Sequence, residues 1–215
     1  VDLAANRSVP MNYYYVLTTI QSKLPRDANI MQEGANTMDI GRTILQNYLP
    51  KSRLDAGTFG AMGVGFGQIL AFCLVHPDRK CVAVVGDSAF GFSGMEYETV
   101  CRYKLNALII VLNNNGIVSG SKEWLPEWDK DTSGALKIPP TSLKPSNNYE
   151  KMAEVFGGSM WLAITPTELE EQLPLALASS GPGIFHIRID PTSDRKKQDF
   201  AFDPTNSAAK KGIFC

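Results

Sequence analysis

The sequence predicts a three-layer α/β sandwich, in which helices cover both faces of a mainly parallel central sheet of about six strands. Residues 81–85 (CVAVV) and 108–112 (LIIVL) are short, β-branched and apolar throughout, which is typical of buried parallel strands. Residues 93–103 between them have a helical pattern. Two strands joined in this way form a right-handed βαβ unit, so their polar tips are expected at the same edge of the sheet.

The other elements follow from the same periodicities. The helix between the two strands is expected to place Met95, Thr99 and Val100 on its inward face. Residues 11–24 carry apolar side chains at helical spacing and are followed by a proline, which predicts a helix. The remaining expected elements are a strand at 29–31, a helix at 41–48, a lead-in at 53–56 to the glycine-rich segment 57–63, a helix ending at Val75, helices at 149–156 and 167–179, and strands at 161–164 and 183–189.

Composition bounds the class of protein. A chain of 215 residues with 44% apolar content can bury one substantial core. A formal net charge of −1 gives no electrostatic case for nucleic acid or an anionic membrane as a partner. The longest apolar stretch, 62–75, is interrupted by glycines and too short to span a bilayer. The four cysteines lack C-x-x-C spacing, which favours buried thiols and an intracellular compartment.

Three regions are expected along the chain. Residues 1–10 are polar and have the character of a linker that follows a missing preceding domain, residues 11–193 form the folded domain, and residues 194–215 form a C-terminal tail. The segment 119–148 is irregular and contains Trp124 and Trp128, which could line an acyl channel or belong to a surface elaboration.

Polar residues follow both central strands of the predicted sheet. Asp87 follows the first strand and Asn113, Asn114 and Asn115 follow the second. Ligands of open α/β sheets bind at this edge, and carboxylate, amide and carbonyl oxygens are ligands that Mg²⁺ accepts. Glycines at 86, 91 and 94 permit a tight turn whose N–H groups can hold phosphate oxygens. The sequence therefore predicts a diphosphate held through a divalent metal.

The two histidines, His76 and His186, are expected to be structural, because they are too far apart to form a nucleophile pair or a zinc site. The chain shows no serine, cysteine or lysine in an activated-nucleophile motif. No catalytic residue is therefore expected within it, and a cofactor must supply the chemistry.

The spacing of these groups resembles a known signature. Gly86-Asp87-Ser88, then 24 residues, then Asn113-Asn114 is similar to the motif of the thiamine diphosphate (ThDP) enzymes, although the third position is often glycine. Residues 33–50, 53–67 and 86–103 resemble the 2-hydroxyacyl-CoA lyases, which are related to oxalyl-CoA decarboxylase. The likeness runs from about residue 10 to residue 200.

This resemblance implies a set of site residues. Asn36 and Thr37 would contact the diphosphate, although by themselves they also suit a helix cap. The carbonyl of Gly60 would accept from the 4′-amino group of ThDP, and Met62 would support the bent cofactor, although core packing is the default for a lone methionine. The implied metal ligands are Asp87, Asn114 and Gly116, and the implied cofactor contacts are Asn36, Thr37, Gly60, Met62, Asp87, Ser88, Ala89, Asn114 and Ile117.

The resemblance also implies a function for the whole protein. Its cofactors would be ThDP and Mg²⁺, and its substrate an acyl-CoA: a 2-hydroxyacyl-CoA cleaved to formyl-CoA and an aldehyde one carbon shorter, as in fatty acid α-oxidation. An essential glutamate would come from the protein's own N-terminal domain in a second subunit of a homodimer or homotetramer. The chain alone would then be inactive.

Three further points stay open. Oxalyl-CoA decarboxylase, another ThDP decarboxylase or carboligase, and a non-catalytic module are the alternatives, and Val118, where relatives usually have tyrosine, is the one hint of the last. Arg195, Lys196 and Lys197 could bind CoA phosphates as part of a lid. A peroxisomal location follows from the resemblance, but the chain does not end in a tripeptide of the S-K-L type.

Overall fold

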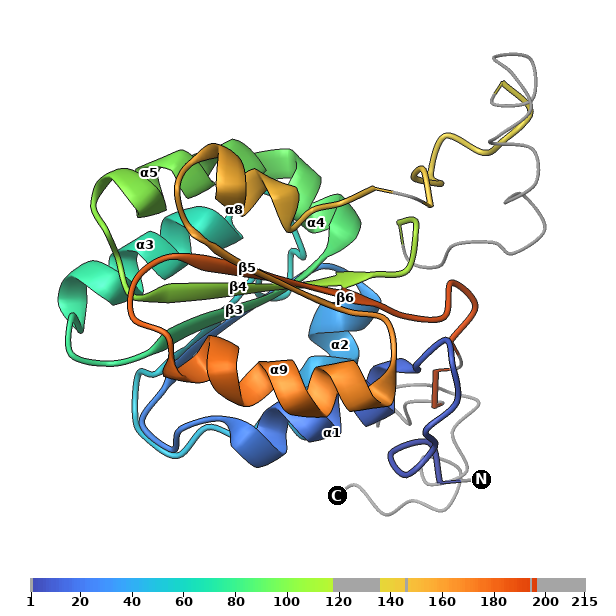
Figure 1. Cartoon of the computed structure of the whole chain (residues 1–215), viewed down its shortest axis with the longest axis horizontal. Coiled ribbons are helices and arrows are strands. Elements are labelled where there is room, and N and C mark those ends of the chain that lie inside the picture. Colours follow the sequence, from blue (N-terminus) through green and yellow to red (C-terminus); the bar gives the residue numbers. More distant parts are fainter. Residues whose placement is uncertain (1, 118–135, 146, 194, 197–215) are drawn as a thin grey trace, which may run out of the picture.

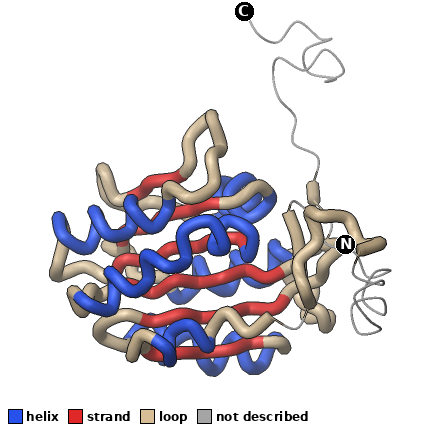
Figure 2. The backbone as a smooth tube through the Cα atoms, turned by 90° about the horizontal axis from the view of Figure 1, so that it is seen from above, coloured by secondary structure: helices blue, strands red, loops and turns tan. Residues whose placement is uncertain are grey.

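The computed structural model describes residues 2–117, 136–145, 147–193, 195 and 196. Its centre is a six-stranded parallel sheet with the order β2-β1-β3-β4-β6-β5, seen edge-on in Figure 1 and from above in Figure 2. The strands are β1 (Asn29–Glu33), β2 (Arg53–Asp55), β3 (Cys81–Gly86), β4 (Ala107–Asn113), β5 (Ser159–Ala163) and β6 (Gly183–Arg188). The predicted fold class is confirmed.

Helices cover both faces of this sheet. The lower layer in Figure 1 consists of α1 (Tyr13–Lys23), α2 (Asn36–Ile44) and α9 (Pro166–Ala178). The upper layer consists of α3 (Gly65–Val75), α4 (Asp87–Ser93), the 3₁₀ turn η1 (Gly94–Glu96), α5 (Tyr97–Arg102) and α8 (Lys151–Val155). The structure therefore has three layers.

Two hydrophobic cores result, one on each face of the sheet. In β3, Val82 and Val84 belong to the core between the sheet and helices α1 and α9, whereas Ala83 and Val85 belong to the core between the sheet and helices α3 and α5. Successive strand residues point to opposite faces, so a strand that is covered on both sides is apolar at every position. This explains why CVAVV and LIIVL show no alternation.

The connection between β3 and β4 differs from the single helix expected at 93–103. It consists of α4, η1 and α5 in succession, and α4 begins at Asp87, where a glycine turn was expected. The inward face was predicted correctly only in part: Val100 is buried as expected, but Met95 is 66% exposed and Tyr97 is buried instead. A Cβ at Gly94 would lie 2.9 Å from the Phe90 ring, so the close packing at this break favours glycine.

Other boundaries are also different. The helix expected at 41–48 begins earlier, at Asn36, and ends at Ile44, and the lead-in at 53–56 contains the edge strand β2. Cys73 and Cys81 are free and buried, as expected, whereas Cys101 is free but only partly buried, and Cys215 lies outside the described residues. Within the described ranges, no helix has the length and apolar character needed to cross a bilayer.

Candidate functional site

A cavity of about 830 Å³ opens at the carboxyl edge of the sheet. Its walls come from the ends of four neighbouring strands: residues 34–37 follow β1, residues 57–62 follow β2, residues 86–89 begin at the last residue of β3, and residues 114–117 follow β4. The lining includes every site residue named from the sequence: Asn36, Thr37, Gly60, Met62, Asp87, Ser88, Ala89, Asn114, Gly116 and Ile117. The structure thus brings the whole set together around one space.

Asp87 joins two of these walls. Its side chain is 1% exposed, its Oδ1 accepts from the Ser88 N–H at 2.7 Å, and its Oδ2 accepts from the Gly116 N–H at 3.1 Å. Burial raises the pKa of Asp87 to about 7, although the backbone donors act in the opposite direction. A buried carboxylate of this kind is stabilised by a cation, and Asp87, Asn114 and the Gly116 carbonyl offer oxygen donors of the type that Mg²⁺ accepts.

The ends of β1 and β3 approach closely at the base of the cavity. Gly34 has φ = 110°, and a Cβ there would lie 3.3 Å from the Gly86 nitrogen. A Cβ at Gly86 would in turn lie 3.3 Å from the Thr37 hydroxyl. Both positions therefore favour glycine, and the absence of side chains leaves room for a ligand against the backbone.

Two hydroxyl groups point to a phosphate in this space. Thr37 lies at the start of α2 and is 2% exposed, so it is placed among the N–H groups of a helix N-terminus. The Ser88 hydroxyl is buried and has no hydrogen-bond partner within the described part of the chain. An unsatisfied buried donor is costly unless a ligand completes it. The residues present therefore fit a metal-bound diphosphate.

The opposite wall is the loop between β2 and α3, which carries Gly60 and Met62. The carboxylate of Glu33 holds this loop, because its Oε1 accepts from the N–H groups of Gly63 and of Val64, the latter at 2.9 Å. Glu33 is fully buried, and burial raises its pKa while these donors lower it. This role of Glu33 was not predicted from the sequence. Its position at the end of a strand was the available signal.

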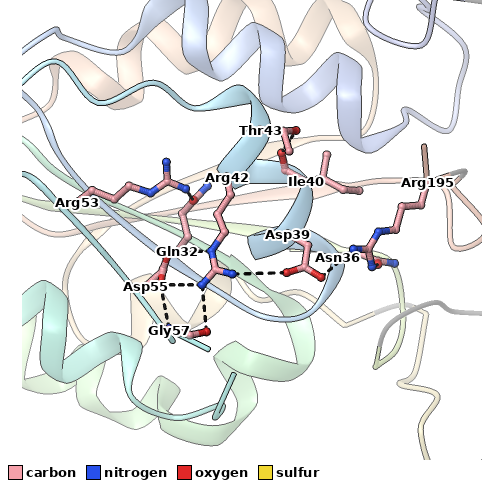
Figure 3. A network of polar contacts seen from close by, with 10 residues as sticks. All are labelled: Gln32, Asn36, Asp39, Ile40, Arg42, Thr43, Arg53, Asp55, Gly57 and Arg195. Carbon is pink, nitrogen blue, oxygen red and sulfur yellow. Dashed lines mark hydrogen bonds and ion pairs between the residues drawn. The ribbon is translucent and has the colours of Figure 1, made fainter. Parts of the chain in front are cut away.

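Ion pairs fix the rim of the cavity. Figure 3 shows the Arg42 guanidinium, whose Nε and Nη2 each donate to Asp55 at 2.9 Å and whose Nη2 also donates to the Gly57 carbonyl at 3.0 Å. Asp39, one turn before Arg42 on α2, accepts from Arg195 at 2.9 Å. These contacts tie the loop after β2 and the segment after β6 to α2 (Figure 3).

The basic cluster near the C-terminus contributes to this rim. Arg195 also donates to Asn36 Oδ1 at 3.2 Å, and Lys196 lies over the Tyr14 ring, 4.9 Å from its centroid. Lys197 lies outside the described residues, as do Val118, Trp124 and Trp128. A smaller space of about 360 Å³ beside the main cavity shares Asp87, Ser88 and Ile117 with it and is bounded by Phe92, Leu143 and Tyr149.

The two histidines have partners at opposite edges of the sheet. His76 contacts Asn29 at the amino edge, and His186 contacts Asn113 and Glu150 at the carboxyl edge. Among the described residues, no group of three or more His, Cys, Asp or Glu side chains could hold a metal ion by itself.

Comparison with known proteins gives a consistent result. The family described as "Thiamine pyrophosphate enzyme, C-terminal TPP binding domain" matches residues 33–187. Over 206 residues the chain is 49% identical to "2-hydroxyacyl-CoA lyase 1" of Homo sapiens, and the aligned region covers 93% of this chain and 36% of that protein. Over 186 residues it is 39% identical to "Oxalyl-CoA decarboxylase" of Escherichia coli (strain K12), and the aligned region covers 86% of this chain and 32% of that protein.

The fold is also found among solved structures. Benzoylformate decarboxylase from Polynucleobacter necessarius superposes with a TM-score of 0.69 at 18% identity, covering 90% of this chain and 35% of that one. At this identity the likeness concerns the fold alone. The chain spans about a third of the length of the relatives named above. It belongs to the thiamine pyrophosphate enzymes, as a C-terminal TPP-binding domain related to that of the 2-hydroxyacyl-CoA lyases.

Proposed function

We propose that this chain holds the diphosphate of ThDP through Mg²⁺, as the cofactor-binding part of a lyase that cleaves 2-hydroxyacyl-CoA into formyl-CoA and an aldehyde one carbon shorter. The observation that carries the cofactor proposal is the cavity at the carboxyl edge. It brings together the buried Asp87 carboxylate, the Ser88 hydroxyl without a hydrogen-bond partner in the described structure, and the closely packed Gly34 and Gly86. The lyase proposal rests on the 49% identity with the human enzyme over 93% of the chain.

Each wall of the cavity has a part in this proposal. Asp87, Asn114 and the Gly116 carbonyl would hold Mg²⁺, while Thr37 and Ser88 would donate to phosphate oxygens. Asn36 and Ala89 would line the same end of the cofactor, and Gly60, Met62 and Ile117 would line its ring end. ThDP, when bound, supplies a nucleophilic carbon and an electron sink for cleavage of a carbon–carbon bond.

The chain would form only part of the catalytic site. It spans about a third of its relatives, and none of its own acids is assigned the activating role of the glutamate expected from an N-terminal domain. We therefore propose that the N-terminal domain of a second subunit completes the site in a homodimer or homotetramer. The 215 residues alone would bind the cofactor without turnover.

Calorimetry of the chain tests the cofactor step. ThDP titrated in the presence of Mg²⁺ should give saturable binding, and EDTA should abolish it, because the diphosphate is held through the metal. Equal heats with and without the metal would contradict the proposal, and so would no binding in either condition.

The substrate class requires the full-length protein that contains this domain. It should cleave a long-chain 2-hydroxyacyl-CoA in a ThDP-dependent manner, faster than it acts on oxalyl-CoA or pyruvate. A preference for oxalyl-CoA would identify a decarboxylase, for which the 39% identity with the E. coli enzyme is the supporting observation. Cofactor binding without action on any of these substrates would indicate a non-catalytic module.

A further inference from the structure

Three buried polar side chains form a line behind the loop that presents Asn114 and Gly116. Glu150 lies just before α8, His186 lies in β6, and Asn113 is the last residue of β4. The His186 Nδ1 lies 2.7 Å from Glu150 Oε2, and its Nε2 lies 3.0 Å from Asn113 Nδ2. His186 is fully buried, and Asn113 is 1% exposed. This line connects α8 with the end of β4 through the interior of the protein.

The hydrogen-bond capacities of these groups fix the direction of every bond. Asn113 Oδ1 accepts from the Asn115 N–H at 3.0 Å, so the amide nitrogen of Asn113 is the group that faces His186. That nitrogen can only donate, so His186 Nε2 must accept and carries no proton. An ionised Glu150 carboxylate accepts, and His186 Nδ1–H therefore donates to it. The neutral Nδ1–H tautomer satisfies all of these contacts.

The far end of this line is a turn in the left-handed conformation. Asn115 has φ = 62°, in a region that asparagine adopts more readily than most other residues except glycine. The Asn113 carboxamide oxygen holds its N–H, and the Asn115 carbonyl accepts from Leu143 at 2.9 Å. One residue later, the Gly116 N–H donates to Asp87. The turn at Asn115 therefore sets where Asn114 and Gly116 lie relative to Asp87.

We propose that His186 is a positioning residue for the metal loop, defined here as residues 114–116. It fixes the orientation of the Asn113 carboxamide, which in turn holds the left-handed turn at Asn115. The ligating role of the loop rests on the proposed function, whereas the hydrogen-bonded line itself does not. His186 thus contributes to metal and cofactor affinity without contacting either one.

The ring nitrogens of His186 can be observed directly, because the chain contains two histidines, His76 and His186. Long-range ¹H–¹⁵N spectra of the chain labelled at histidine should show His186 as the neutral Nδ1–H tautomer. Addition of Mg²⁺ and ThDP should shift the His186 signals and leave those of His76, at the opposite edge, unchanged. An Nε2–H tautomer of His186, or binding that leaves its signals in place, would overturn the inference.

Three substitutions test whether His186 positions the Asn113 carboxamide through a hydrogen bond or only fills space in the core. His186→Leu removes the acceptor and should raise the dissociation constant for ThDP in the presence of Mg²⁺ about tenfold. His186→Gln restores an acceptor toward Asn113 and should stay within about threefold of wild type. His76→Leu is the matched control and should leave the constant unchanged. An equal loss in the Leu and Gln variants of His186 would mean that the ring only fills space, against the inference.

Two further measurements keep the test decisive. Should His186→Leu fail to fold, Asn113→Ala replaces it, because this variant leaves the His186–Glu150 contact intact and should produce the same tenfold loss. Exchange of the Asn115 amide proton should be slow in wild type and faster in either variant. If the wild-type chain binds no ThDP, the proposed function fails, while the tautomer and the Asn115 exchange still decide whether His186 holds the turn.

Discussion

Two asparagine–histidine pairs, the first partly buried and the second fully buried, lie at opposite edges of the same sheet. At the amino edge, Asn29 begins β1, and its Nδ2 lies 3.3 Å from His76 Nδ1, just after α3. At the carboxyl edge, Asn113 ends β4, and its Nδ2 lies 3.0 Å from His186 Nε2. The residue types are the same, but the carboxamide oxygens of the two asparagines differ in their contacts. Asn29 Oδ1 has no hydrogen-bond partner in the described structure, whereas Asn113 Oδ1 accepts from the Asn115 N–H.

The difference shows how the two edges use buried polar groups. At the amino edge such groups join neighbouring elements: Lys80 Nζ donates to the carbonyl of Ser179, which follows α9, at 2.7 Å and to Asn106 at 3.1 Å. At the carboxyl edge Glu33, Asp87 and Asn113 each hold backbone N–H groups of loops that line the cavity. Substitutions at the two edges should therefore affect different quantities, stability at one and ligand binding at the other.

The largest effect is expected for Asp87→Asn. Loss of the only anionic ligand proposed for Mg²⁺ should weaken metal-dependent ThDP binding at least about 100-fold, measured by calorimetry. The stability of the unliganded protein should change little, because the amide avoids the cost of burying a carboxylate but loses one of the two backbone N–H contacts that Asp87 accepts. Asp78→Asn, an exposed change in the turn between α3 and β3, is the matched control. Unaltered ThDP affinity in the Asp87 variant would refute the metal site.

A second prediction contrasts the two asparagines. Asn113→Ala should weaken ThDP binding about tenfold, since the turn at Asn115 loses its side-chain acceptor. Asn29→Ala should leave the affinity within about twofold, because its contacts face away from the cavity. Side-by-side titrations decide the matter, and similar losses in both variants would show that the two edges are not independent.

A smaller loss is expected for Thr37→Val. This change preserves side-chain volume and removes one hydroxyl donor to the phosphate, which should weaken ThDP binding roughly three- to tenfold. Thr19→Val on α1 is the control, because the Thr19 hydroxyl donates to the Tyr15 carbonyl at 2.9 Å, within its own helix. Binding that is unchanged in the Thr37 variant would remove the start of α2 from the phosphate site.

The smallest effect concerns pH and the amino edge. Burial lowers the pKa of Lys80 to about 8 from an ordinary value of 10.5. Between these values the unfolded state binds more protons than the folded state, so the contribution of Lys80 to the free energy of unfolding rises with pH. Relative to Lys80→Met, the wild type should gain about 1 to 2 kcal/mol between pH 8 and pH 10 in urea denaturation.

Lys80→Met should leave ThDP binding unchanged at pH 7.5, because Lys80 lies at the edge away from the cavity. If the free energies of unfolding of wild type and variant changed in parallel from pH 8 to pH 10, the pKa of Lys80 would not be lowered by folding, and the prediction would fail. If ThDP binding fell, the separation of the two edges would be wrong.

The sequence predicted those features that depend on short stretches of chain. The apolar runs gave the parallel strands, and the polar residues after them gave a site at their carboxyl ends. The family resemblance supplied the residues of the ring end, Gly60, Met62 and Ile117, and the structure places them around the same cavity as Asp87. Local periodicity failed at Met95 and Tyr97, because the crossover segment is divided into α4, η1 and α5, and the spacing of a single helix does not describe such a segment.

What the sequence by itself determined is therefore the fold class, which local patterns of hydrophobicity indicate, and the polar residues after two strands, which one spaced motif identifies, whereas the other cavity residues came from the family resemblance. The tertiary structure alone decided which distant groups support them. Glu33 holds Val64, Arg42 holds Asp55, and His186 holds Asn113, 73 positions away along the chain. Such pairs form only when the order of the strands brings their ends together, because a hydrogen bond requires contact between groups that no local pattern connects.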